Sequence, residues 1–405
     1  MTERNLKTNI VTANEPVIVL ARNFSTALGV IRALGERGYD VYLIALSYRK
    51  GALAPAAASR YLKGFTEVVC RDAMNDGEHR LLEAIRTLAS PDRKTLFPTD
   101  DFTAYVTDKN RASLEKNFNL PSADEDLWSL MDKSRQNELA KAAGFESAGT
   151  LSLTAKSCED SLKSAPYPCF CRHARSLRGQ KSDMKICRGP EELRAYLQDI
   201  DTRAPGSSVL VQKYLNIDCE LDIAGVCCKS NVVTPGYIKK TAVSKHQPGI
   251  TMSGTLCGAD EEFEPIKKLK KMLAGLNYRG MFDAEIIVSE GEYYFGEINF
   301  RCGGPSHVYD LLGVNLPDMA VRSMRGESLG DAAEIPVEEA SFVLEKAVLE
   351  DEIFGNITHA EAASIIGNAA LKLLADEEDP APERIYKKQL RRLKRNAAIK
   401  KIIGR

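Results

Sequence analysis

The sequence predicts an α/β region at the N-terminus, followed by an α+β region, and three observations support this. Helical segments alternate with four short apolar runs, at 16–20, 41–44, 68–70 and 95–98. Such alternation predicts a parallel sheet with right-handed crossovers. Further along, segment 220–224 alternates polar and apolar residues, as antiparallel strands with one solvated face do. Finally, segments 282–286 and 295–301 flank a polar turn, which indicates a β-hairpin.

Composition limits the class of protein. The chain has 405 residues, too many for one ordinary hydrophobic core, so two or three domains are expected. A net charge of −1 gives no global field for nucleic acid, and we expect no such partner. The sequence has no apolar run long enough to span a bilayer and no signal-peptide core. Its ten cysteines do not show the spacing of a zinc site. A cytoplasmic protein with buried thiols is therefore expected.

The predicted hairpin carries the strongest chemical signal. Alternate side chains of a strand share a face, so Glu297, Asn299 and Arg301 point one way. Pairing of the two strands brings Glu285 beside Glu297. Crowded carboxylates favour a hard cation, and a few oxygen ligands beside an arginine suit magnesium bound to phosphates. The alternative is an ordinary hairpin with one solvated polar face.

Three other segments need an interpretation. The turn after the first strand lacks Gly-x-Gly-x-x-Gly, which argues against a dinucleotide site. Segment 239–258, rich in Lys, Ser, Thr and Gly, is predicted to be a long mobile loop that closes over the site. Segment 376–382 is acidic and rich in proline, as linkers are, and a basic tail follows at 384–405 with ten Lys or Arg. That tail is predicted to be either a solvated or internally packed helix or a helix on an anionic membrane surface.

Four motifs follow one another along the chain. Asp132-Lys133 opens a predicted helix, and Arg172 ends the strand 168–172. Gln212-Lys213-Tyr214-Leu215 ends a later strand, and the last motif is Glu297-x-Asn299-x-Arg301. In this order, over roughly 16–326, the chain resembles the ATP-grasp superfamily of carboxylate–amine ligases. The resemblance implies an N-terminal parallel-sheet domain, two α+β lobes that clamp ATP, and a C-terminal extension with a basic helical tail. The corresponding expected boundaries are 1–125, 126–208, 209–330 and 331–405.

The resemblance also implies roles for individual residues. Lys133 and Arg172 would reach the nucleotide phosphates. Backbone groups of Lys213 and Leu215, next to Gln212, would hold adenine. Glu220, or else Asp218, would bind the ribose.

The hairpin residues take the remaining roles. Glu285, Glu297 and Asn299 would bind Mg²⁺, with Mn²⁺ as the alternative ion. Arg301 would hold the reacting acyl phosphate, which makes Arg301, Lys133 and Arg172 the expected catalytic residues. No general base is evident, and His307 is predicted to be either structural or close to the reacting centre.

The sequence also departs from the family pattern and points to one branch of it. The usual Gly-rich loop over the phosphates is replaced by segment 175–180, which has one glycine. Four less specific motifs look like the D-aspartate-ligase-like branch and its relatives, which include carbamoyl-phosphate-synthase-like members. They lie at 58–61, 97–101, 313–317 and 379–382.

The activity expected from the resemblance is ATP-dependent amide formation between a carboxylate and an amine through an acyl phosphate. The substrates would be small molecules, an amino acid and a cell-envelope precursor among them. The alternatives are a small-molecule kinase built on the same clamp and a nucleotide-binding protein without turnover. A homodimer, and contact of the 384–405 tail with the inner face of a membrane, are further expectations.

Overall fold

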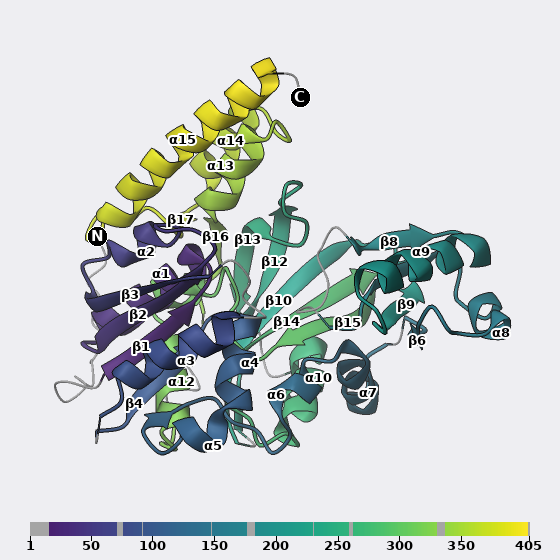
Figure 1. The fold of residues 1–405 in the computed structure, drawn as a ribbon, viewed down its shortest axis with the longest axis horizontal. Coiled ribbons are helices and arrows are strands. Elements are labelled where there is room, and N and C mark those ends of the chain that lie inside the picture. The colour runs from purple at the N-terminus through teal and green to yellow at the C-terminus, as the bar shows by residue number, and fades with distance from the viewer. Residues whose placement is uncertain are drawn as a thin grey trace.

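The computed structural model describes residues 16–70, 76–90, 92–146, 148–175, 183–229, 231–258, 262–329 and 337–403. Three sheets lie in a row, with the N-terminal sheet at one end, a large sheet in the centre and a small sheet at the other end (Figure 1). The C-terminal helix runs along the outside of the N-terminal part (Figure 1).

The N-terminal sheet is parallel, as its apolar runs predicted. Its strand order is β3-β2-β1-β4-β5. The strands are β1 (Pro16–Ala21), β2 (Asp40–Ser47), β3 (Leu62–Val69), β4 (Lys94–Pro98) and β5 (Phe118–Asn119). The connecting helices are α1 (Phe24–Glu36), α2 (Ala54–Ala57), α3 (Glu78–Thr87), α4 (Asp101–Lys109) and α5 (Arg111–Leu114). The strand order reverses between β1 and β4, and a ligand site is expected outside the carboxyl ends of such a pair.

The small sheet has the order β6-β9-β7-β8 and is antiparallel. Its strands are β6 (Leu151–Leu153), β7 (Cys169–His173), β8 (Lys185–Cys187) and β9 (Val209–Lys213), with helices α8 (Glu159–Lys163) and α9 (Pro190–Arg203). Helices α6 (Leu127–Leu130) and α7 (Lys133–Ala143) precede it, and α7 ends at Gly144, as predicted. Strand β9 belongs to this sheet because it pairs with β6 and β7, so the expected boundary at residue 208 lies one strand too early.

The large sheet has the order β15-β14-β10-β12-β13-β16-β17, with β11 paired to β10. Its strands are β10 (Cys219–Cys228), β11 (Asn231–Val233), β12 (Gly236–Val243), β13 (Thr251–Gly258), β14 (Arg279–Ser289), β15 (Glu292–Asn299), β16 (Ala340–Val343) and β17 (Leu371–Lys372). Helices α10 (Glu264–Ala274), α11 (His307–Leu311) and α12 (Leu316–Met324) pack beside it. The hairpin β14–β15 confirms the pairing predicted from the sequence.

Segment 239–258 is a β-hairpin, so the prediction of a long mobile loop is wrong. Its residues form most of β12 and β13, which pair in antiparallel register. The short turn between them is fixed from outside the hairpin by Asp351, which is fully buried on α13 (Glu345–Ile353). Asp351 accepts hydrogen bonds from the Ser244 hydroxyl and from the backbone N–H groups of Lys245 and His246, at 2.8–2.9 Å. The prediction relied on the polar composition of this segment, but strands with one solvated face also contain many polar residues.

Replacing Asp351 by asparagine will destabilise the fold by about 2 kcal/mol at neutral pH, because a charged acceptor of three hydrogen bonds is lost. Burial raises the pKa of Asp351, but the donors from Lys245, His246 and Ser244 outweigh it and hold the pKa below its ordinary value. A carboxyl with a lowered pKa stabilises the fold above its unfolded pKa, near 4, and this stabilisation is lost as the pH falls. Urea unfolding at neutral and acidic pH will show the gap between wild type and variant closing in acid. A gap that stays constant would contradict this account.

The C-terminal region is built into the fold and does not form a separate extension. Strands β16 and β17 complete the large sheet, and α13 and α14 (His359–Asn368) follow them. The prediction of an acidic linker at 376–382 is wrong at its centre, because Asp379 is 1% exposed. Asp379 pairs with the buried Arg32 of α1 at 3.1 Å and accepts a hydrogen bond from the Ser59 hydroxyl at 2.8 Å. Two of the four branch-type motifs, at 58–61 and 379–382, therefore meet at the buried carboxylate of Asp379.

The basic tail forms α15 (Ala381–Ile403), whose first half is anchored to the rest of the protein. Tyr386 is buried and packs against Phe24 at a ring distance of 5.0 Å, and Gln389 donates a hydrogen bond to the Gly51 carbonyl. Lys394 lies 3.8 Å from Glu352 of α13. These contacts favour the internally packed helix for this half of the tail. Among the described residues, no helix is both long and apolar enough to cross a membrane.

Candidate active site

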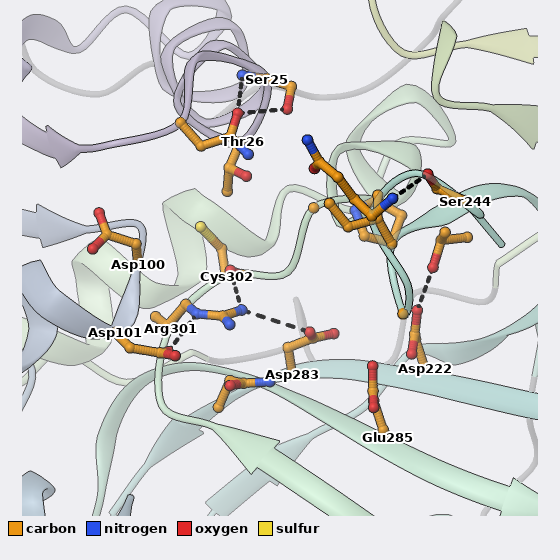
Figure 2. A pocket seen from close by; sticks show the side chains of 18 of the residues that line it. Ser25, Thr26, Asp100, Asp101, Asp222, Ser244, Asp283, Glu285, Arg301 and Cys302 are labelled. Atoms are coloured by element: carbon orange, nitrogen blue, oxygen red, sulfur yellow. Dashed lines mark hydrogen bonds and ion pairs between the residues drawn. The ribbon is translucent and has the colours of Figure 1, made fainter. Parts of the chain in front are cut away.

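A cavity of about 460 Å³ lies where the N-terminal sheet, the small sheet, the large sheet and α13 meet. Six of the ten residues predicted from the sequence line it: Lys133, Arg172, Glu285, Glu297, Asn299 and Arg301. These residues come from three regions of the chain, which only the fold brings together. Figure 2 shows part of this cavity, with Asp283 and Glu285 on its floor and Arg301 beside Asp101.

The floor of the cavity is a face of carboxylates. Glu285 lies opposite Glu297 in the β14–β15 ladder, and Asp283 lies opposite Asn299. Strand β10 adds Asp222, which pairs in register with Glu285. The sequence prediction included neither Asp222 nor Asp283.

The electrostatics of this face suit a divalent cation. Burial and the neighbouring carboxylate of Glu285 raise the pKa of Asp283 to about 6, against the lowering effect of Arg301. Burial likewise raises the pKa of Asp222 to about 8, although Lys240 acts to lower it. One oxygen of Asp283 is buried without a hydrogen-bond partner among the described residues. In that part of the chain, no three His, Cys, Asp or Glu side chains converge as a closed metal cluster. The assignment of Glu285, Glu297 and Asn299 as Mg²⁺ ligands stays a prediction.

Glu297 is held by two cations from the small-sheet side of the cavity. The Lys133 ammonium donates a hydrogen bond to Glu297, and the Arg172 guanidinium lies 3.6 Å from the same oxygen. Arg172 also donates to the Gly296 carbonyl at 2.8 Å. Burial raises the pKa of Glu297, but Lys133 and Arg172 outweigh it and keep the group ionised. Lys133 and Arg172, the two predicted phosphate-binding residues, thus both contact strand β15, which carries the predicted Mg²⁺ ligands Glu297 and Asn299.

A glycine makes this approach possible. The register of the β14–β15 ladder shifts between Glu285 and Ile286, which leaves Gly296 as an extra residue in β15. A Cβ atom at Gly296 would lie 2.8 Å from the Glu285 carbonyl oxygen. The bulge therefore requires glycine.

Arg301 follows strand β15, which carries two of the predicted Mg²⁺ ligands, and connects it to helix α4 of the N-terminal region. Its Nε donates to Asp101 at 2.9 Å, and its Nη1 lies 3.8 Å from Asp283 (Figure 2). Asp101 begins α4, directly after the carboxyl end of β4. The motif at 97–101, which the sequence associated only with a family branch, thus supplies a partner for the predicted catalytic arginine.

For the ATP-dependent activity that the sequence predicts, we expect replacement of Asp101 by asparagine to lower kcat by about tenfold while the Km for ATP changes little, because Arg301 loses a charged partner that fixes its guanidinium. Steady-state kinetics at saturating nucleotide will separate the two parameters. Asp126→Asn, an exposed helix N-cap elsewhere, is the control. An unchanged kcat would show that Asp101 does not position Arg301.

Lys240 is a buried cation that the sequence prediction missed. Its side chain is 3% exposed, and its ammonium lies 2.9–3.2 Å from Glu220, Asp222 and Glu285. Burial lowers the pKa of Lys240, but these three carboxylates outweigh it and hold the residue charged. The residue was missed because its strand was interpreted as part of a mobile loop. The signal lay in Ile238 and Lys240, which alternate with exposed positions along β12.

The four residues expected to hold adenine and ribose lie outside the cavity lining. Gln212 is buried and donates to the Thr150 hydroxyl at 3.0 Å, and the Lys213 backbone N–H donates to the Ala148 carbonyl. Leu215 follows the end of β9 and is half-buried. Glu220 does not line the cavity, but it pairs with Lys240, which also contacts the cavity residues Asp222 and Glu285.

The alternative ribose ligand, Asp218, has a structural contact. It accepts a hydrogen bond from the Glu290 backbone N–H in the hairpin turn, at 2.7 Å. Of the two, Glu220 is the better placed to meet a ligand in the cavity.

Two other expectations have clear outcomes. His307 is buried behind the turn at Gly303-Gly304, does not line the cavity, and packs against Gly29, so a structural role fits it best. The segment expected to cover the phosphates lies mostly outside the described residues. Its first residue, Arg175, pairs with Asp132 at 3.0 Å and stacks on Trp128.

Sequence comparison finds relatives among carbamoyl phosphate synthase large chains, while no family model matches the chain. The large chain from Rubrobacter xylanophilus is 25% identical over 293 residues, which are 66% of this chain and 27% of that protein. The large chain from Agathobacter rectalis is 24% identical over 211 residues, 51% of this chain and 19% of that one. The chain thus spans 19% to 27% of the length of these two relatives.

Solved structures share the architecture more completely. N5-carboxyaminoimidazole synthetase from Staphylococcus aureus matches with a TM-score of 0.62 at 16% identity, over 87% of this chain and 88% of that one. The biotin carboxylase domain of 2-oxoglutarate carboxylase from Hydrogenobacter thermophilus, solved with MgADP and bicarbonate, matches with a TM-score of 0.62 at 19% identity, over 80% and 73%. An L-amino acid ligase from Bacillus licheniformis matches with a TM-score of 0.59 at 13% identity, over 82% and 80%.

These likenesses define the class of protein: the chain has the ATP-grasp fold. The predicted fold class and the predicted resemblance to carbamoyl phosphate synthase large chains are both confirmed.

Proposed function

We propose that this protein is an ATP-dependent carboxylate–amine ligase, which forms an amide bond through an acyl phosphate and releases ADP and phosphate. One observation supports this above all. A single cavity is lined by two cations from the small-sheet side, an acidic floor with an amide, and an arginine that reaches the N-terminal sheet. Phosphoryl transfer needs this combination, because it depends on positioning and on neutralising charge.

Each group of residues has a defined task in this proposal. Lys133 and Arg172 leave Glu297 to hold the nucleotide phosphates, whose negative charge replaces the Glu297 carboxylate as the partner of the two cations. Glu285, Glu297 and Asn299 would hold Mg²⁺, whose positive charge would neutralise that of the phosphates. Arg301, held by Asp101, binds the substrate carboxylate through its planar fork and keeps it in line with the γ-phosphate.

Exclusion of water is the second requirement, because an acyl phosphate hydrolyses. The turn of the β12–β13 hairpin contributes Ser244, Gln247 and Ile250 to the cavity wall, and Asp351 fixes that turn. Because the wall on this side is fixed, the cavity would close by movement of the small sheet, which carries Arg172 and faces the floor. In this proposal, the small sheet moves and the hairpin remains in place.

The proposed partners are a small carboxylate and a small amine. The L-amino acid ligase of similar fold supports amino acids as substrates to test first. A cell-envelope precursor, a homodimer, and membrane contact through the distal half of α15 are further proposals. Pelleting with anionic vesicles and measurement of the mass in solution will test the last two.

Phosphate release from MgATP, measured across pools of carboxylates and amines, tests the proposed function. A ligase will release phosphate only when an acid and an amine are both present. A kinase would consume ATP without releasing phosphate and would leave a phosphorylated product. If the protein binds ATP but shows no turnover with any pool, the result would contradict the proposal. It would favour the alternative of a nucleotide-binding protein without catalytic activity.

A further inference from the structure

The N-terminus of α1 opens into the same cavity, on the side away from Lys133 and Arg172. Asn23 caps the helix, and its side-chain oxygen accepts hydrogen bonds from the Ser25 N–H at 3.0 Å and the Ser25 hydroxyl at 2.9 Å. The first turn contains no acidic residue. The helix therefore presents its positive end to the cavity without a compensating carboxylate of its own.

Thr26 gives independent evidence for a ligand at this point. The residue is 9% exposed and lines the cavity, and Figure 2 shows its side chain directed into the cavity from the start of α1. Among the described residues, neither its hydroxyl nor its backbone N–H has a hydrogen-bond partner, although Asn23 satisfies the neighbouring Ser25. The first N–H groups of a helix have no intrahelical partner, and the Thr26 hydroxyl faces the cavity, so both donors are open to an acceptor from outside the protein.

The position in the sheet points the same way. Helix α1 follows β1, and Asp100 follows β4, which are the two strands between which the strand order reverses. In open α/β sheets, ligands bind in the crevice outside the carboxyl ends of such strands. The part of the cavity at Thr26 and Asp100 is that crevice.

The carboxylates around this part of the cavity already have hydrogen-bond donors. Lys346 of α13 lines it and pairs with Glu350 at 2.8 Å, and Glu350 also accepts a hydrogen bond from the Tyr386 hydroxyl. Asp100 is occupied by backbone N–H groups of Arg22, Phe102 and Thr103, at 3.0–3.1 Å. Both carboxylates therefore already have donors, whereas the donors of Thr26 have no acceptor.

We propose that the N-terminus of α1, with the Thr26 hydroxyl and the Lys346 ammonium, binds an acidic group of the amine substrate. The inference rests on the proposed function and narrows its substrate class to amines that carry a second, anionic group. That group is a carboxylate or a phosphate, since both accept several hydrogen bonds from N–H and O–H donors. Thr26 belongs to α1 of the N-terminal region, whereas Lys133 begins α7 and Arg172 lies on β7 of the small sheet, which are the groups proposed to hold the nucleotide phosphates.

The test compares matched amines that differ in the acidic group. Amino acids, their carboxamides, and aminoalkyl phosphates are offered with MgATP and a pool of carboxylates, and phosphate release is measured. A carboxamide has the less basic amine, so a larger share is unprotonated, and its failure cannot be due to a shortage of free amine. We expect acid-bearing amines to be used and the neutral carboxamides to be at least tenfold poorer. The carboxylate and phosphate series show which acid is preferred.

Variants locate the subsite. Thr26→Val keeps the side-chain volume, and Lys346→Met keeps an unbranched stem but removes the ammonium group. We expect each to raise the Km for the amine about tenfold to a hundredfold, as loss of a hydrogen bond to a charged group does, with the Km for ATP unchanged. Lys387→Met removes an exposed lysine of α15 and is the control, expected to change neither Km.

The outcomes separate this inference from the proposed function. Calorimetric titration with MgATP measures nucleotide binding without any amine. If ATP-dependent ligation occurs and carboxamides serve as well as acids, the anion subsite is wrong and the ligase stands. If both variants leave the Km for the amine unchanged, the subsite is elsewhere, which also overturns the inference. If ATP binds but no amine of any series supports turnover, both proposals are overturned.

Discussion

Replacing Glu297 by glutamine will lower ATP-dependent turnover by about a thousandfold, because the residue combines two tasks in the cavity. It is a proposed ligand of the divalent cation, and it is the acidic partner of Lys133 and Arg172. Glutamine keeps the shape of the side chain but carries no charge. The cation would lose a ligand, and two cations of the protein would lose their carboxylate.

The matched control for this variant is Glu292→Gln on the same strand, where the side chain is exposed and the residue lies opposite Ser289 at the end of the hairpin. It should retain full turnover. Circular dichroism will show that both variants keep the fold. Activity within tenfold of wild type in Glu297→Gln would mean that the cation is bound by other residues, with Asp283 the first to examine.

The second large effect is on stability. Replacing Asp379 by asparagine will lower the free energy of unfolding by about 3 kcal/mol or more, because Arg32 stays buried without its counter-charge. Both side chains are 1% exposed, and Asp379 also accepts hydrogen bonds from Ser59 and from the Arg60 N–H. The pair fastens the segment before α15 to α1, whose first turn lies at the cavity.

Asp376→Asn supplies the comparison for this variant. Asp376 lies 3.6 Å from the same arginine but is 18% exposed, so its loss should cost about 1 kcal/mol or less. Urea unfolding of the two variants at neutral pH will measure the difference. Equal effects of the two substitutions would show that Arg32 is neutralised by both acids together and that Asp379 is not its main partner.

The sequence predicted those parts of the site that lie within one local pattern. The alternation of Glu297, Asn299 and Arg301 fixes their common face, and the turn at 289–292 fixes the pairing with Glu285. The helix that begins at Lys133 was recognisable because Asp132 and Gly144 mark its start and end, whereas the role of Lys133 came from the resemblance to the ATP-grasp superfamily. In each case, the physical information lies within a few residues.

Residues that depend on long-range packing could not be predicted in this way. Lys346 and Thr26 are 320 positions apart in the sequence and line one cavity only because the tertiary fold brings α13 and the start of α1 to it. The partnership of Asp101 with Arg301 spans 200 residues. Lys240 was missed for a different reason: polar residues of a strand with one solvated face resemble those of a loop.

The central claim is that a carboxylate of one substrate is activated by phosphorylation in the cavity beside Arg301. The most direct measurement uses a substrate whose carboxylate carries isotopically labelled oxygen. In an acyl-phosphate route, one labelled oxygen passes from the carboxylate to the released phosphate, so mass spectrometry will find labelled phosphate in proportion to amide formed. Amide formation with unlabelled phosphate, or a stable phosphorylated product that retains the label, would contradict the account.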